Sequence, residues 1–203
     1  MKRFLRSTVR VFAAVNALII THIFLSYFIV PKLTTNNICI KDPRMMEPAT
    51  LGAIKEVIST FNRHNINIKL GCKNSFTSMN LSYGDIKAPE ILAQTWAHFI
   101  FIDLYAKQGK YEYPVSEIFI PLVHFYPLSV PIVFDDSYLP EDDLTTFKFT
   151  LIHEIGHALG APHVFYDERN IMYPFIDVSV NQTLDSAVLQ VKELTYWIQR
   201  YKK

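Results

Sequence analysis

The stretch LIHEIGHALGAPH, Leu151 to His163, constrains the fold of this chain more than any other. His153 and His157 are four residues apart, so in a helix they lie one above the other on a single face. Gly160 can adopt a left-handed conformation, which predicts the end of that helix. Apolar residues at helical spacing predict its core-facing side: Leu144, Phe147, Leu151, Ile155 and Ala158. We therefore expect a buried helix that carries two imidazoles side by side.

The residues that end this helix complete a candidate metal site. By turning the chain back, Gly160 delivers His163 to an ion held by the two helical histidines, and Pro162 stiffens the turn. A catalytic zinc ion needs three protein ligands and an open position for water. Glu154 is not required as a ligand, which leaves its carboxylate free to take a proton from the zinc-bound water. An isolated helical histidine is usually structural, but the fixed offsets of these residues favour a metal site.

These residues also resemble a known family. HEIGHALGAPH fits the pattern HExxHxxGxxH, and NIMYP follows at Asn170 to Pro174. Together they resemble the zinc-binding motif and the Met-turn of the metzincin zinc endopeptidases, in the form found in the matrixins, the matrix metalloproteinase-type enzymes. The resemblance is closest over residues 151–174 and looser over residues 45–200. It implies an α+β catalytic domain with a twisted, mixed five-stranded sheet, an active-site helix, a Met-turn and a C-terminal helix.

The resemblance also implies a role for each residue of the motif. The zinc ligands would be His153, His157 and His163, and the general base would be Glu154. Met172 would form an apolar base beneath the metal. The resemblance implies four substrate-binding residues: Tyr173 and Pro174 beside the specificity pocket, and Val123 and His124 on an edge strand near residues 122–126. Such a strand would pair with an extended substrate through main-chain hydrogen bonds.

Departures from the matrixin pattern limit the metal content that we expect. Of the histidines that hold a second, structural zinc in matrixins, only His124 has a counterpart here, and Val133 stands at another of these positions. A calcium ion is conceivable at Asp135, but Tyr138 stands where the family has a partner glutamate. Val164 replaces the serine that usually follows the third ligand. We therefore predict one catalytic zinc ion and doubt the calcium.

The expected function is zinc-dependent hydrolysis of peptide bonds in extended polypeptide segments, with a protein or peptide as the substrate. The alternative is a catalytically weak, zinc-binding, membrane-tethered interaction module on the same scaffold. The intact Glu154 favours the enzyme. We do not expect nucleic-acid binding, because 20 lysines and arginines balance 19 acidic residues and the sequence shows no basic stripe.

The N-terminus predicts a membrane anchor. A basic segment, residues 1–10, precedes the apolar run Val11 to Val30, whose length as a helix would reach roughly 30 Å, the thickness of a bilayer's hydrocarbon core. The positive flank would remain cytoplasmic, which places the catalytic domain outside the cytoplasm or in a lumen. The alternative is a cleaved signal peptide and a secreted protein.

The remaining chain divides into a short linker and one domain. Residues 31–48, polar and rich in proline, predict a stalk, and residues 49–203 predict the protease domain. Cys39 and Cys72 form either a single disulfide or two free thiols. Periodicity predicts a helix over residues 51–61, strands over residues 66–70, 98–105, 118–126 and 130–134, and a packing helix within residues 181–203.

Overall fold

A computed structural model of the 203-residue chain describes residues 16–17, 36–72, 78–86, 92–95, 99–108, 111–121, 130–138, 143–174 and 182–195. The expected membrane anchor, residues 11–30, lies outside the described residues except for Asn16 and Ala17. Among the helices of the described part, none has the length and apolar character needed to cross a membrane.

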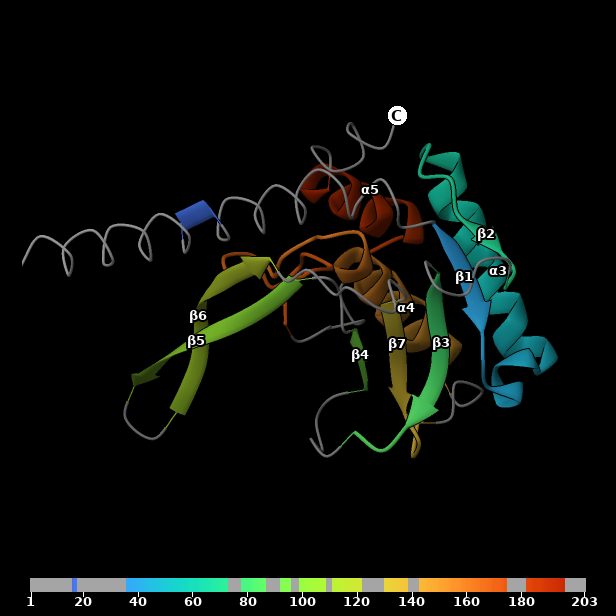
Figure 1. The fold of residues 1–203 in the computed structure, drawn as a ribbon, viewed down its shortest axis with the longest axis horizontal. Helices are drawn as coiled ribbons and strands as arrows, with labels where there is room; N and C mark the ends of the chain where they lie inside the picture. Colours follow the sequence, from blue (N-terminus) through green and yellow to red (C-terminus); the bar gives the residue numbers. More distant parts are fainter. Residues whose placement is uncertain are drawn as a thin grey trace, which may run out of the picture.

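The centre of the domain is a mixed sheet of five strands in the order β2-β1-β3-β7-β4 (Figure 1). Three neighbouring pairs are parallel, and only β4 runs antiparallel, against β7. The prediction of an α+β fold with a mixed five-stranded sheet is therefore confirmed. The strands are β1 (Asn37–Ile40), β2 (Lys69–Leu70), β3 (Met79–Gly84), β4 (Ala93–Thr95) and β7 (Val130–Asp135).

The first strand corrects the predicted stalk. β1 pairs with β2 on one side and with β3 on the other, and its residues Ile38 and Cys39 are fully buried. The short 3-10 helix η2 (Pro43–Met46) buries Met45 as well. The sequence pattern did not predict this strand, because a strand inside a sheet is covered on both faces. Its four residues therefore show no alternation of polar and apolar side chains. Most of residues 36–48 therefore belong to the folded domain.

β7 contains Pro131 and is nevertheless an interior strand, paired with β3 on one side and with β4 on the other. The backbone N–H of Val130 donates to Ser78 in the direction of β3, at 3.0 Å, so the nitrogen of Pro131 faces the opposite side. On that side β4 begins to pair only at Ile132. The missing donor of Pro131 therefore costs no hydrogen bond of the ladder.

Two long strands form a separate hairpin. β5 (Phe99–Gln108) pairs with β6 (Tyr111–Pro121) in an antiparallel two-stranded sheet that lies beside the main one (Figure 1). The predicted strand over residues 98–105 is thus confirmed, and it extends to Gln108. Of the strand predicted over residues 118–126, only the part up to Pro121 falls within the described residues.

Three further helices pack around the sheet: α3 (Pro48–Arg63), α4 (Leu144–Ala158) and α5 (Leu184–Leu194). α4 contacts both other helices and also β4 and β7. Asp143 caps α4 by accepting from the N–H groups of Thr145 and Thr146. The active-site helix expected from the sequence is therefore held on several sides.

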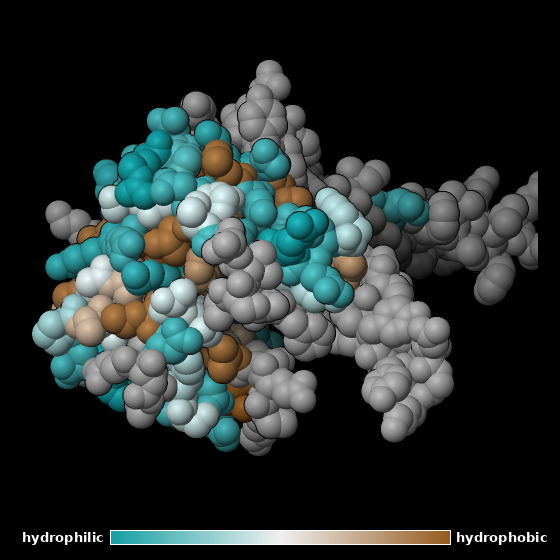
Figure 2. Space-filling model, turned by 180° about the vertical axis from the view of Figure 1, so that it is seen from behind, coloured by the Kyte–Doolittle hydropathy of each residue, from teal (hydrophilic) through white to brown (hydrophobic). Residues whose placement is uncertain are grey.

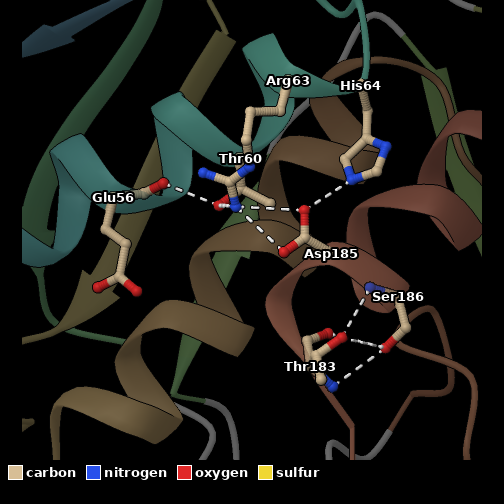
Figure 3. A network of polar contacts seen from close by, with 7 residues as sticks. All are labelled: Glu56, Thr60, Arg63, His64, Thr183, Asp185 and Ser186. Atoms are coloured by element: carbon tan, nitrogen blue, oxygen red, sulfur yellow. Dashed lines mark hydrogen bonds and ion pairs between the residues drawn. The ribbon is translucent and has the colours of Figure 1, made fainter.

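Polar and charged side chains connect the end of α3 to the start of α5 (Figure 3). Arg63 and His64 contact the carboxylate of Asp185 at 3.1 and 2.8 Å. Thr183 and Ser186 form a capping box at the first turn of α5. These contacts link the start of α5 to the end of α3.

The coloured part of the surface in Figure 2 is mostly hydrophilic, with apolar residues scattered over it. Among the described residues, the large exposed hydrophobic side chains lie on separate segments of the chain: Met46, Leu70, Leu92, Tyr166 and Leu189. Scattered apolar residues of this kind are normal on protein surfaces.

Cys39 and Cys72 form a disulfide, which resolves the alternative that the sequence left open. We expect reduction to lower the free energy of unfolding by about 2–5 kcal/mol, because it frees a loop that links β1 to the chain after β2. Urea unfolding with and without a reductant measures this effect. The double variant C39A/C72A is the control and should not respond to the reductant. An equal stability of the oxidised and reduced wild type would contradict the prediction.

Candidate metal centre

The end of α4 has the turn that the sequence predicted. Gly160 has a φ of 93°, in the left-handed region. The N–H of Ala161 donates to the carbonyl of Gly156, and that of Gly160 to the carbonyl of His157, both at 2.8 Å. This pair of hydrogen bonds is the Schellman motif, which reverses the chain after a helix. The reversal carries the next residues back toward the face that bears the two helical histidines.

Three histidines meet at this point. The Nε2 atom of His157 lies 3.0 Å from that of His153 and 3.1 Å from that of His163. One potential ligand atom from each side chain lies within 4.8 Å of the other two. His153 and His157 are buried, and His163 is partly exposed. The three side chains are close enough to bind one metal ion, as predicted.

Backbone carbonyls fix the orientation of two of the rings. The Nδ1 atom of His153 lies 2.6 Å from the carbonyl oxygen of Ile171, and that of His157 lies 2.9 Å from the carbonyl oxygen of Ala161. Because a carbonyl only accepts, each Nδ1 must carry the proton, and each neutral ring presents a bare Nε2 lone pair. Two such acceptors 3.0 Å apart repel one another unless they share a cation or a proton. The arrangement therefore fits a metal cation.

Burial keeps the two rings neutral. It lowers the pKa of His153 to about 3, with a further contribution from the nearby His163. It also lowers the pKa of His157 well below the usual value for histidine. A metal ion binds the neutral imidazole, so protons compete weakly for these ligands at neutral pH.

The carboxylate next to the first ligand is buried too. Glu154 is 5% exposed, and its Oε2 atom has no hydrogen-bond partner within the part of the chain that the structure describes. Burial raises its pKa to about 7, although hydrogen bonding from Thr95 opposes the shift. A carboxyl group that titrates near neutrality both accepts and releases protons at physiological pH. This is the property expected of a general base that later acts as an acid.

Met172 packs against α4 close to the ligands. Its side chain is fully buried, and its backbone carbonyl accepts from the N–H of Val164 at 2.8 Å. A Cβ atom added at Gly156 would lie 2.6 Å from the Met172 sulfur and 3.2 Å from a methyl group of Val191. The helix and the segment expected to form the Met-turn thus approach closely because residue 156 lacks a side chain.

This close approach predicts the effect of one methyl group. We expect G156A to lower the free energy of unfolding by about 1–2 kcal/mol, because the strain of overpacking exceeds the gain in helix propensity. Chemical denaturation of the purified protein measures the change.

Gly52 provides a matched control for G156A. It lies inside α3, and an added Cβ there has nothing within 4 Å. G52A should therefore raise stability by roughly 0.5–1 kcal/mol. If both variants were stabilised equally, the proposed packing of Met172 on the helix would be wrong.

The remaining predicted site residues separate into two groups. Tyr173 and Pro174 follow Met172 directly and are half-buried. Val123 and His124, with the edge strand predicted around them, lie outside the described residues. In the described sheet, the edge position beside β7 belongs to β4, whose residue Thr95 donates from its hydroxyl to the Glu154 carbonyl at 3.1 Å. Sequence reasoning missed β4 because three residues are too few for a periodic pattern.

Protein groups surround Asp135, the residue at which a calcium ion was conceivable but doubted. The Asp135 carboxylate accepts from the Ser137 backbone N–H and hydroxyl and from the N–H of Ile86. The neighbouring Asp136 forms an ion pair with Arg44 at 2.8 Å. The guanidinium of Arg44 therefore lies beside this corner of the described structure, and a calcium ion at Asp135 stays an expectation that Tyr138 makes doubtful.

Comparison with known proteins identified no relative of this chain. No family model matches the sequence, and no curated protein matches it either.

Proposed function

We propose that this chain is a zinc-dependent endopeptidase of the metzincin type, similar to the matrixins. One observation carries the proposal: three imidazole Nε2 atoms converge on a common point, and the same helix holds a buried carboxylate next to the first ligand. A structural site would fill its coordination with protein groups, whereas the three ligands found among the described residues leave a position open for water.

The spacing of the ligands is compatible with zinc as the metal. Zinc bound by histidine has a Zn–N distance of about 2.0–2.1 Å, so tetrahedral ligands lie about 3.3 Å apart. The Nε2 separations of 3.0 and 3.1 Å are close to this value. The Nδ1–H groups of His153 and His157 already donate to carbonyls, which is the usual way in which a protein orients metal-binding histidines.

Glu154 would perform the proton transfers of peptide hydrolysis. A zinc ion held by His153, His157 and His163 would supply Lewis acidity, which lowers the pKa of water and polarises the scissile carbonyl. Glu154 takes the proton of the attacking water and delivers it to the amine that leaves. Its burial suits this task, because a poorly solvated carboxylate is a stronger base than an exposed one.

The edge of the sheet would bind the substrate. β4 is the last strand of the described sheet, and Thr95 connects it to Glu154 through a hydrogen bond. An extended peptide that adds to this edge through main-chain hydrogen bonds would pass close to the catalytic carboxylate. We also propose that residues 11–30 tether the enzyme to a membrane, with the domain on the non-cytoplasmic side.

A metal and cleavage assay of the purified full chain tests this function. We expect about one zinc per chain and cutting of an unstructured protein such as casein or gelatin, with products identified by mass spectrometry. Stoichiometric zinc with no cleavage of any substrate in a broad peptide library would instead support the interaction module.

A further inference from the structure

A side chain of α5 is connected to the metal centre through two hydrogen bonds. The Oε1 atom of Gln190 accepts from the backbone N–H of Ile171 at 2.8 Å. The carbonyl oxygen of the same residue, Ile171, accepts from the Nδ1–H of His153 at 2.6 Å. Gln190 therefore holds the residue that orients the first metal ligand, although it does not touch the metal site itself.

The orientation of the Gln190 amide follows from its partners. A backbone N–H can only donate, so the atom that it contacts must be the amide oxygen. The side-chain amide of Gln182 donates to the same oxygen at 2.8 Å. Two donors on one acceptor hold the Gln190 side chain in a single position.

The helix that carries Gln190 is itself held in place. Its first turn is capped by Thr183 and Ser186, and Asp185 pairs with Arg63 and His64 at the end of α3 (Figure 3). Val188 and Val191, on either side of Gln190, are fully buried. The oxygen of Gln190 is thus presented to Ile171 from a rigid element.

We propose that Gln190 is a positioning residue for the metal centre: it holds the backbone N–H of Ile171, and the carbonyl of the same residue orients the ring of His153. This inference rests on the metal site of the proposed function but not on its peptidase activity. Loss of the acceptor releases the N–H of the Asn170–Ile171 peptide, so the Ile171 backbone holds the carbonyl that orients the His153 ring less firmly before metal binds. The metal affinity then falls because binding must restore this order.

The test is the zinc dissociation constant of the full chain, measured by competition with a chelator. We expect Q190M, which keeps the size of the side chain but has no acceptor, to weaken zinc binding roughly 3–10-fold, less than the 10–100-fold typical for loss of a direct partner of a ligand. Q190E keeps an acceptor oxygen and should stay within about twofold of the wild type. Thermal unfolding of the metal-free forms reports any general loss of stability.

Asp185→Asn is the matched control. It weakens the attachment of α5 to α3 and leaves the contact between Gln190 and Ile171 intact. It should lower the unfolding temperature without changing zinc affinity. Equal zinc affinity of Q190M and the wild type, or equal weakening in Q190M and Q190E, would overturn the inference. A wild-type chain that binds no zinc would overturn both this inference and the proposed metal centre, whereas zinc binding without proteolysis would overturn the proposed peptidase activity alone.

Discussion

The variant E154Q is expected to retain its zinc and to lose peptidase activity by roughly 10²–10⁴ in kcat/KM, the usual contribution of a general base. Glutamine has nearly the same size as glutamate, so the fold around this buried position should persist. The amide cannot accept the proton of the attacking water, and for this reason the chemical step should slow while the metal stays bound. Cleavage of a fluorogenic peptide, together with metal analysis of the same samples, measures both quantities.

Glu56 offers a control for the loss of a negative charge. It lies on α3 and forms an ion pair with Lys148 at 2.8 Å. E56Q removes the same charge from a half-exposed position and should cleave like the wild type. If E154Q and the wild type cut every substrate equally while both hold zinc, Glu154 is not the base and the proposed mechanism fails.

The variant H157A is expected to lose both the metal and the activity. His157 lies between the other two ligands, with Nε2 separations of 3.0 and 3.1 Å, so its removal leaves two imidazoles that cannot form a catalytic site. A metal whose free concentration is 100–1,000 times its dissociation constant stabilises the folded protein by about 2.7–4.1 kcal/mol. For a chain of this size, its loss should lower the unfolding temperature by roughly 5–15 °C.

Chelation of the wild type should produce a similar decrease, and H157A should not respond to the chelator. His64 supplies the control, because it is a histidine that pairs with Asp185 and takes no part in the cluster. H64A should keep one zinc per chain. An unfolding temperature of the wild type that is insensitive to both zinc and chelator would show that no metal binds to the folded state.

The variants E154Q and H157A also distinguish the two proposed functions, the enzyme and the interaction module. Both functions require the three histidines, so H157A alone does not distinguish them. Only the enzyme requires Glu154. A binding activity that survives E154Q and is lost in H157A would therefore indicate the module, and a cleavage activity lost in both would indicate the enzyme.

The sequence by itself determined the helix α4, its end at Gly160 and the three histidines of the metal site. Each of these depends on local rules. Ligands four residues apart share a helix face, and a left-handed glycine reverses the chain within a few residues. Because the whole motif lies in a single short stretch, its geometry needs no knowledge of distant contacts.

Only the tertiary structure decided how that motif is supported. β1 was mistaken for a stalk because its burial comes from neighbouring strands rather than from its own pattern. The disulfide joins cysteines separated by 33 positions in sequence. Thr95 reaches Glu154 across 59 positions, and Gln190 reaches Ile171 across 19. Such contacts depend on how separate elements pack, and local propensity carries no information about that packing.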